Sequence, residues 1–375
     1  MAGDGVRYRI CHRTSYAYST PVFESFNEGR LQPVVDTTQA LLDFELRIEP
    51  PATVITFRDY YGNSVHDFGV AYLHDRLVIE ASCDVITYAA ADEPLIPAAQ
   101  SGPDLSPPLN ELAGDPIVQD EFAEFLGASP YVALGPESEA IARELLAEEA
   151  ASTALGFLER ATARVGGLLE YRIGTTTVHS SVAEVLDVGS GVCQDFAHVL
   201  ISLCRHGGLP ARYVSGYLGD VPEAGASHAW TEVLVPPYGW LGVDPTHGSH
   251  CTGRYVKIGT GRDYADVSVL RGTYKGGGVA ELEVKVSCET VGGPEQLRQS
   301  NGANGEPNGR LMAIQNLGAM RRFHQGAVLT QAMGGMSQSL SDELPLPPPR
   351  AQKRVEDGSP SQQPPQQQQP DAALS

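Results

Sequence analysis

Cys193 is the cysteine in this 375-residue sequence whose neighbours best suit a reactive thiol. A Gly-Ser-Gly segment leads towards it, and apolar residues recur at helical spacing from Phe196 to Cys204. Two glycines and Pro210 then mark the end of the helix. The pattern predicts that Cys193 lies in the first helical turn, where unpaired N–H groups and the helix dipole favour a thiolate. Such a residue could attack a carbonyl, or it could simply fill space as a small apolar side chain.

A thiolate that attacks an amide needs a base to move protons and a third group to orient that base. His228 begins an alternating segment 35 residues after Cys193, and Asp244 ends the next such segment. A turn at 236–239 predicts a hairpin, and a register in which paired residue numbers sum to about 474 places Asp244 opposite Trp230. Asp244 would then be a diagonal neighbour of His228, whereas a shift of one residue would move it to the other face.

Charge and hydropathy exclude several classes of partner. Lys and Arg number 26 against 46 Asp and Glu, and the formal net charge of −20 argues against binding to nucleic acid or to an anionic membrane. The first residues resemble no secretory signal, and no stretch reaches the ~18 apolar residues of a membrane span. We therefore expect a soluble, cytoplasmic protein.

The six cysteines are scattered, so we expect no disulfide framework. His247, His250 and Cys251 cluster, but the sequence has no Cys-x-x-Cys pair beside them. We therefore interpret them as polar loop residues and expect no structural metal there. Attack by a thiolate requires neither a metal nor an organic cofactor, so we expect none.

Residues 1–88 alternate in short runs that are separated by turn residues, which predicts an antiparallel β domain, sandwich-like or a single sheet. Its dispersed histidines, His12, His66 and His74, are expected to be structural or surface residues and not ligands. Residues 89–116 are rich in Pro, Gly and Ser and are interpreted as a linker.

Residues 117–290 predict amphipathic helices, then the cysteine helix, then antiparallel strands, so the fold class is α+β. Residues 291–375 include a Pro/Gln-rich end and are expected to be a mostly disordered tail that could recruit a protein partner. A short helix is possible at 311–323, where apolar residues recur every three positions.

Four segments carry a resemblance to the bacterial transglutaminase-like superfamily of papain-type thiol enzymes. They are Gly191-Val-Cys193-Gln-Asp195-Phe-Ala-His198, Pro210-Ala-Arg212-Tyr-Val-Ser-Gly216-Tyr, His228-Ala-Trp230-Thr-Glu232 and Gly239-Trp240-Leu-Gly-Val-Asp244-Pro-Thr246. The start of the chain, with Tyr8, His12 and Asn27-Glu-Gly-Arg30-Leu, resembles the β domain that precedes this core in the family. The resemblance covers roughly residues 6 to 290 and leaves the tail outside.

The resemblance implies a papain-like core and a catalytic triad of Cys193, His228 and Asp244 that acts on amide bonds of peptides or glutamine-like carboxamides. Hydrolysis is favoured over transamidation, because water is always present and no residue indicates an amine site. A non-catalytic binding module on the same fold is the alternative from a different class. Trp230 could line the substrate groove or belong to the core.

Neighbouring polar residues have structural interpretations. Arg212 and Glu232 could pair with each other, and Asp263 and Asp266 could brace the last strands. His198 lies five positions after Cys193, so it faces away from the thiol.

Overall fold

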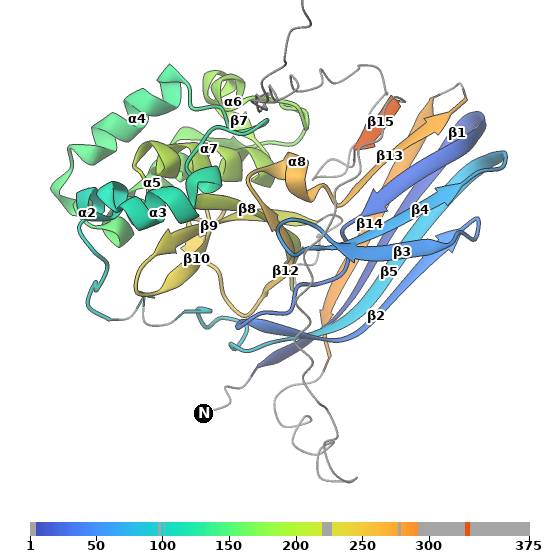
Figure 1. Cartoon of the computed structure of the whole chain (residues 1–375), viewed down its shortest axis with the longest axis horizontal. Helices are drawn as coiled ribbons and strands as arrows, with labels where there is room; N and C mark the ends of the chain where they lie inside the picture. The colour runs from blue at the N-terminus through green and yellow to red at the C-terminus, as the bar shows by residue number, and fades with distance from the viewer. Residues whose placement is uncertain are drawn as a thin grey trace, which may run out of the picture. The chain divides into compact units, whose positions relative to one another are not determined.

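A computed structural model describes residues 5–96, 99–100, 102–219, 227–276 and 279–291, together with the backbone of the strand at 327–330 (Figure 1). These residues form a curled antiparallel sheet and a second, smaller sheet that is covered by helices. The expected α+β class, with an N-terminal β domain before a core of helices and antiparallel strands, is confirmed. The predicted helix at 311–323 and the Pro/Gln-rich end lie outside the described residues.

The N-terminal strand organises the larger sheet. Strand β1 (Val6–Gly29) is bent, and a register shift between Ala17 and Val22 divides its pairing. Its first half lies between β5 and β14, and its second half lies between β4 and β13. The other strands of this eight-stranded sheet are β2 (Gln39–Glu49), β3 (Val54–Arg58), β4 (Ser64–Val70), β5 (His74–Thr87), β13 (Leu270–Lys275), β14 (Ala280–Thr290) and β15 (Ala327–Thr330).

The smaller sheet has five strands in the order β11-β10-β9-β8-β12. They are β8 (Ala211–Leu218), β9 (His228–Val235), β10 (Gly239–Asp244), β11 (Ser249–His250) and β12 (Tyr255–Gly261). The helices are α2 (Leu109–Gly114), α3 (Pro116–Glu121), α4 (Pro136–Leu146), α5 (Ala154–Leu168), α6 (Val182–Val188), α7 (Cys193–His206) and α8 (Tyr264–Val267). Two short strands, β6 (Glu170–Tyr171) and β7 (Ser190–Gly191), form a parallel pair beside α7.

Helix α7 lies at the centre of the core. Every residue from Cys193 to Arg205 is buried, because β8 and β9 cover one side and α4, α5 and α6 cover the others (Figure 1). The helix ends where predicted: Gly207 caps it, and Gly208 follows with a φ of 80° that favours glycine. A nucleophile at the start of this helix is therefore held by a rigid scaffold.

The structure corrects two of the domain boundaries. Strands β13 and β14, which we assigned to the core, pair with β1 in the N-terminal sheet. The segment that we interpreted as a linker contains helix α2. The alternation of residues 280–290 indicates a strand but cannot show which sheet it joins, because pairing partners are distant in sequence.

Buried polar contacts join the larger sheet to the core. The Nδ1 atom of His12 lies 2.9 Å from the hydroxyl of Tyr217. The side chain of Gln39 donates to the carbonyl of Lys257 at 2.9 Å and accepts from its N–H at 2.8 Å. The Nζ of Lys257 also lies 2.9 Å from the carboxylate of Asp36. His12 thus has the structural role that we expected.

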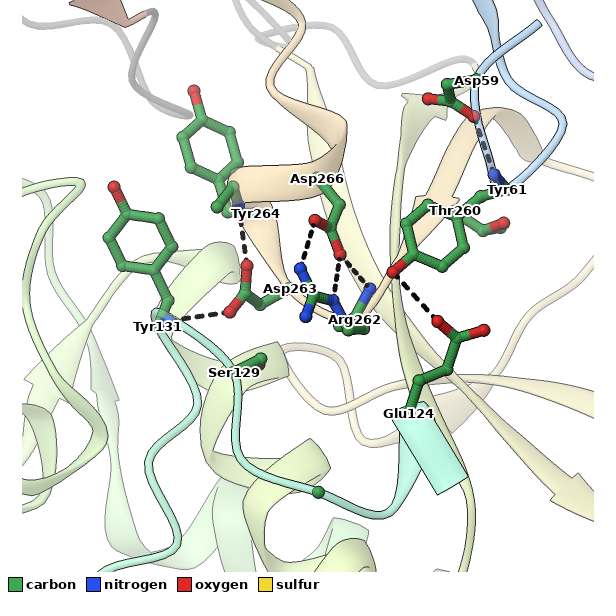
Figure 2. A network of polar contacts seen from close by, with 12 residues as sticks. Asp59, Tyr61, Glu124, Ser129, Tyr131, Thr260, Arg262, Asp263, Tyr264 and Asp266 are labelled. Carbon is green, nitrogen blue, oxygen red and sulfur yellow. Dashed lines mark hydrogen bonds and ion pairs between the residues drawn. The ribbon is translucent and has the colours of Figure 1, made fainter. Parts of the chain in front are cut away.

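A second polar network anchors the turn after β3 to the core (Figure 2). The guanidinium of Arg262 donates to both carboxylate oxygens of Asp266 at 2.9 Å. Tyr61 donates to Glu124 at 3.3 Å, and Asp263 accepts the backbone N–H of Tyr131 at 2.7 Å. Asp263 also caps helix α8, so both acidic residues brace this region as predicted.

Within the described residues, none of the helices has the length and apolar character needed to span a membrane.

Candidate active site

The approach to Cys193 is built from tight turns. Helix α6 ends at Gly189 in the left-handed conformation, and Gly191 follows two residues later. The carboxylate of Asp195 accepts the N–H of Val192 at 2.8 Å and so closes the first turn of α7. A Cβ atom at position 191 would lie 2.5 Å from that carboxylate, so only glycine fits there. Cys193 is the first residue of the helix, as predicted.

The hairpin of β9 and β10 has the predicted register. Trp240 pairs with Leu234 and Val243 pairs with Thr231, so the paired numbers sum to 474. Asp244 therefore lies beside His228, and its Oδ2 is 2.7 Å from Nε2 of that ring. The two residues that were predicted to be diagonal neighbours therefore form a direct side-chain hydrogen bond.

Cys193, at the start of α7, and His228, at the start of β9, lie close enough for the thiol to affect the pKa of the imidazole. Nε2 of His228 faces Asp244, so Nδ1 is the nitrogen available to the sulfur. Burial alone would lower the pKa of His228, but hydrogen bonds to Asp244 and Cys193 outweigh it and raise the pKa to about 10. The ring therefore holds its proton at neutral pH. Cys193 itself is 3% exposed.

Asp244 is fully buried and accepts several hydrogen bonds. Its Oδ1 accepts the backbone N–H of Thr246 at 2.8 Å, in a turn formed by the sequence Asp-Pro-Thr. Its Oδ2 accepts from His228, from Nδ1 of His247 at 2.7 Å and from the hydroxyl of Tyr255 at 2.8 Å. Burial by itself raises the pKa of this carboxyl, but the two histidines lower it well below its usual value. The carboxylate is therefore ionised beside His228.

Trp230 packs against the candidate site from within the core. The sequence left it open between the substrate groove and the core, and the residue is only 2% exposed. Its ring stacks on His228 with centroids 6.3 Å apart and meets Tyr255 edge-on at 5.3 Å. The far edge of the indole lies against Gly216, where a Cβ atom would be 2.4 Å away. Trp230 therefore packs against the ring of His228. The sequence could not decide between its two roles, because the alternation of a strand does not show whether a face meets solvent or another layer.

Sequence reasoning missed three residues at the site. His247 was treated as a loop residue, although its place three positions after Asp244 was a signal. Tyr255 reaches Asp244 from β12, and no sequence signal indicated this contact. Tyr171 is 49% exposed and pairs with Gly191 through the β6–β7 ladder. Burial and, to a smaller extent, electrostatic interactions with Cys193, Asp195 and Asp244 raise its pKa to about 12.

Other polar residues have the structural roles that we predicted. Arg212 donates to Glu232 at 2.8 and 2.6 Å across β8 and β9. His198 faces away from the thiol and stacks on Tyr131 at 5.9 Å. Burial lowers the pKa of His198 to about 3, so it stays neutral.

His228, Asp244 and His247 each offer an atom that could bind a metal ion, and these atoms lie within 4.8 Å of one another. Both ring nitrogens are, however, 2.7 Å from a single carboxylate oxygen, the spacing of charge-assisted hydrogen bonds. The arrangement is therefore that of two rings hydrogen-bonded to one carboxylate oxygen.

The sequence matches the profile of the transglutaminase-like superfamily over residues 139–245, which include all three residues of the Cys193–His228–Asp244 arrangement. Residues 8–86 match the bacterial transglutaminase-like N-terminal region. This chain belongs to the transglutaminase-like superfamily.

The sequence similarity to two relatives covers most of this chain. An uncharacterized protein of Mycobacterium leprae is 34% identical over 75% of this chain and 97% of its own length. An uncharacterized protein of Mycobacterium tuberculosis is 38% identical over 71% of this chain and 87% of its own. The structure is similar to that of a candidate cysteine protease from Cytophaga hutchinsonii, with a TM-score of 0.61 and 21% identity over 77% of this chain and 92% of the other. That similarity shows the fold.

Proposed function

We propose that this transglutaminase-like protein is a cysteine-dependent acyl-transfer enzyme that hydrolyses amide bonds of peptides or glutamine-like carboxamides. The observation that supports it is the 2.7 Å contact between Nε2 of His228 and the buried carboxylate of Asp244, with the Cys193 thiol close enough to act on the same ring. Members of the superfamily are typically enzymes, and the three side-chain types are those of a thiol triad.

In the proposed acylation step, the Cys193 thiolate attacks the carbonyl carbon and forms a C–S bond. The electron pair of the carbonyl moves to oxygen and then returns as the C–N bond breaks. His228 donates its proton to the departing nitrogen, so ammonia or an amine leaves and a thioester remains on Cys193. Asp244 holds the ring in the required orientation throughout.

In the proposed deacylation step, neutral His228 accepts a proton from water as the water oxygen attacks the thioester. Collapse of the intermediate breaks the C–S bond, returns the thiolate and releases a carboxylic acid. Because the backbone N–H of Cys193 belongs to the first turn of α7, it has no acceptor within the helix and can stabilise the developing oxyanion.

Transamidation is the second candidate, in which an amine replaces water as the acceptor. A protein-glutamine gamma-glutamyltransferase of Pseudomonas aeruginosa is 39% identical to this chain over 72 residues, although the match spans 17% of this chain and 11% of the other. The shared segment favours a thioester intermediate for both reactions, and the acceptor then decides the outcome.

A peptide pool incubated with the pure protein, with and without a primary amine, tests these alternatives by product mass. Hydrolysis adds water across a peptide bond or converts a glutamine carboxamide to an acid, whereas transamidation attaches the amine. The Cys193→Ala variant is the matched control, and both reactions should stop in it. Turnover that persists in that variant would refute the thiol mechanism.

A further inference from the structure

His247 occupies an unusual position at the proposed site, because it bonds to the same carboxylate oxygen as His228. The two ring nitrogens are each 2.7 Å from Oδ2 of Asp244, and the ring centroids are 5.5 Å apart. The His247 side chain is 51% exposed, whereas that of His228 is 14% exposed. One ring thus faces the thiol and the other faces solvent.

The oxygen between them receives more donors than it has lone pairs. Oδ2 accepts from His228, from His247 and from the hydroxyl of Tyr255, which lies 2.8 Å away. A carboxylate oxygen offers two lone-pair directions, so three donors must share its charge. Each donor therefore weakens the hydrogen bonds that the other two make.

We propose that His247 is a positioning residue that competes with His228 for Oδ2 of Asp244 and so limits how firmly the carboxylate holds the His228 proton. The catalytic meaning of this sharing rests on the proposed acyl transfer, in which His228 must release a proton to the leaving nitrogen. A general acid works best when its proton is not held too strongly at the operating pH. His247 keeps the buried ring usable as an acid.

The neighbourhood of the pair contains few other titratable groups among the described residues. Cys193 faces His228 from α7, Tyr171 faces the site from β6, Tyr255 faces Asp244 from β12, and Cys251 lies near Asp244 after β11. Burial raises the pKa of Cys251, Tyr171 and Tyr255, so these groups remain neutral when the histidines titrate. A change at His247 therefore acts on His228 mainly through Asp244.

The direct test is an NMR titration of the histidine rings in the full-length chain carrying Cys193→Ala, which removes the thiol from every arm equally. His247→Ala should raise the midpoint of the His228 ring by about half a pH unit or more, because a competing donor is gone. His247→Asn keeps an N–H donor and should lie nearer the parent. His250→Ala, on the adjacent strand, is the matched control and should leave the midpoint unchanged.

A midpoint that stays in place or falls in His247→Ala would overturn the proposal. In the chain that retains His247, the signal of His228 should also respond at the pH where His247 titrates, and its failure to do so would count equally against it. This measurement needs no substitution at His247, so it holds even if a variant fails to fold. It also needs no substrate, so it is independent of the peptide-pool assay on the chain that retains Cys193: if that assay finds no turnover, the proposed function fails while the sharing of Asp244 stands.

Discussion

Nε2 of His228 lies 2.7 Å from Oδ2 of Asp244, although the two residues are 16 positions apart and belong to different strands. The β9–β10 register fixes this distance, and Trp230 and Tyr255 surround the pair. Because the carboxylate is fully buried, the contact is shielded from water and acts strongly on the ring. The predictions below follow from that shielded contact and from the groups that hold it in place.

Selective alkylation tests whether the thiol is activated. Cys11 is more exposed than Cys193, so exposure alone predicts that iodoacetamide modifies Cys11 first. The contact with His228 predicts the reverse order at mildly acidic pH, because the imidazolium favours the thiolate. Mass spectrometry of partly labelled protein should find Cys193 modified first. His228→Ala should abolish this preference, and uniform labelling of the parent would favour a binding module.

Asp244→Asn should reduce turnover of an amide substrate by about three orders of magnitude, because the amide no longer fixes the protonated ring in place. Steady-state kinetics should show the loss mainly in kcat. Asp187→Asn, at an exposed position on α6, is the matched control and should behave like the parent. A small effect of Asp244→Asn would show that orientation of His228 does not limit the reaction.

The pH dependence of stability has a definite sign. The pKa of His228 is raised from 6.5 to about 10. The contribution of this group to the free energy of unfolding is therefore complete below pH 6.5 and is lost as pH rises through about 10. The pKa of Asp244 is lowered, so its contribution is present above its usual 3.8 and is lost as pH falls further. The free energies of unfolding of the parent and of Asp244→Asn, measured in urea, should therefore differ most at pH values above 3.8 and below 6.5. A gap that widens towards pH 11 would contradict this assignment.

Gly216→Ala should destabilise the protein by about 1–3 kcal/mol, because the new methyl group meets both the indole of Trp230 and the carbonyl of Val256. Displacement of Trp230 should also move His228 and lower turnover. Gly114→Ala is the matched control, since a Cβ atom there meets no atom within 4 Å. Thermal unfolding that is equal for the two variants would mean that the region around Trp230 can relax.

Tyr171→Phe removes the hydroxyl of a half-exposed residue that pairs with Gly191, two positions before Cys193. If the phenol donates to the substrate carbonyl as charge develops there, kcat should fall by about tenfold or more with little change in KM. Tyr60→Phe, at a highly exposed position, is the control. A change confined to KM would instead assign Tyr171 to substrate binding.

The sequence by itself determined much of the local structure around the candidate site. The Gly-rich approach and apolar period predicted that Cys193 begins a helix, and the Pro-rich turn with two alternating segments predicted the register that joins His228 to Asp244. These features are local, because helix ends and hairpin turns depend on residues close together in the chain.

Tertiary structure decided what depends on distant contacts. Only the packing of β12 against β8 brings Tyr255 to Asp244, and only the folded structure around β9 shows that Trp230 is buried. The return of β14 to the N-terminal sheet was equally hidden, because an alternating strand can pair with any open edge. His247 lies between these cases: its position beside Asp244 is visible in the sequence, but only the folded turn aims its ring at the shared oxygen.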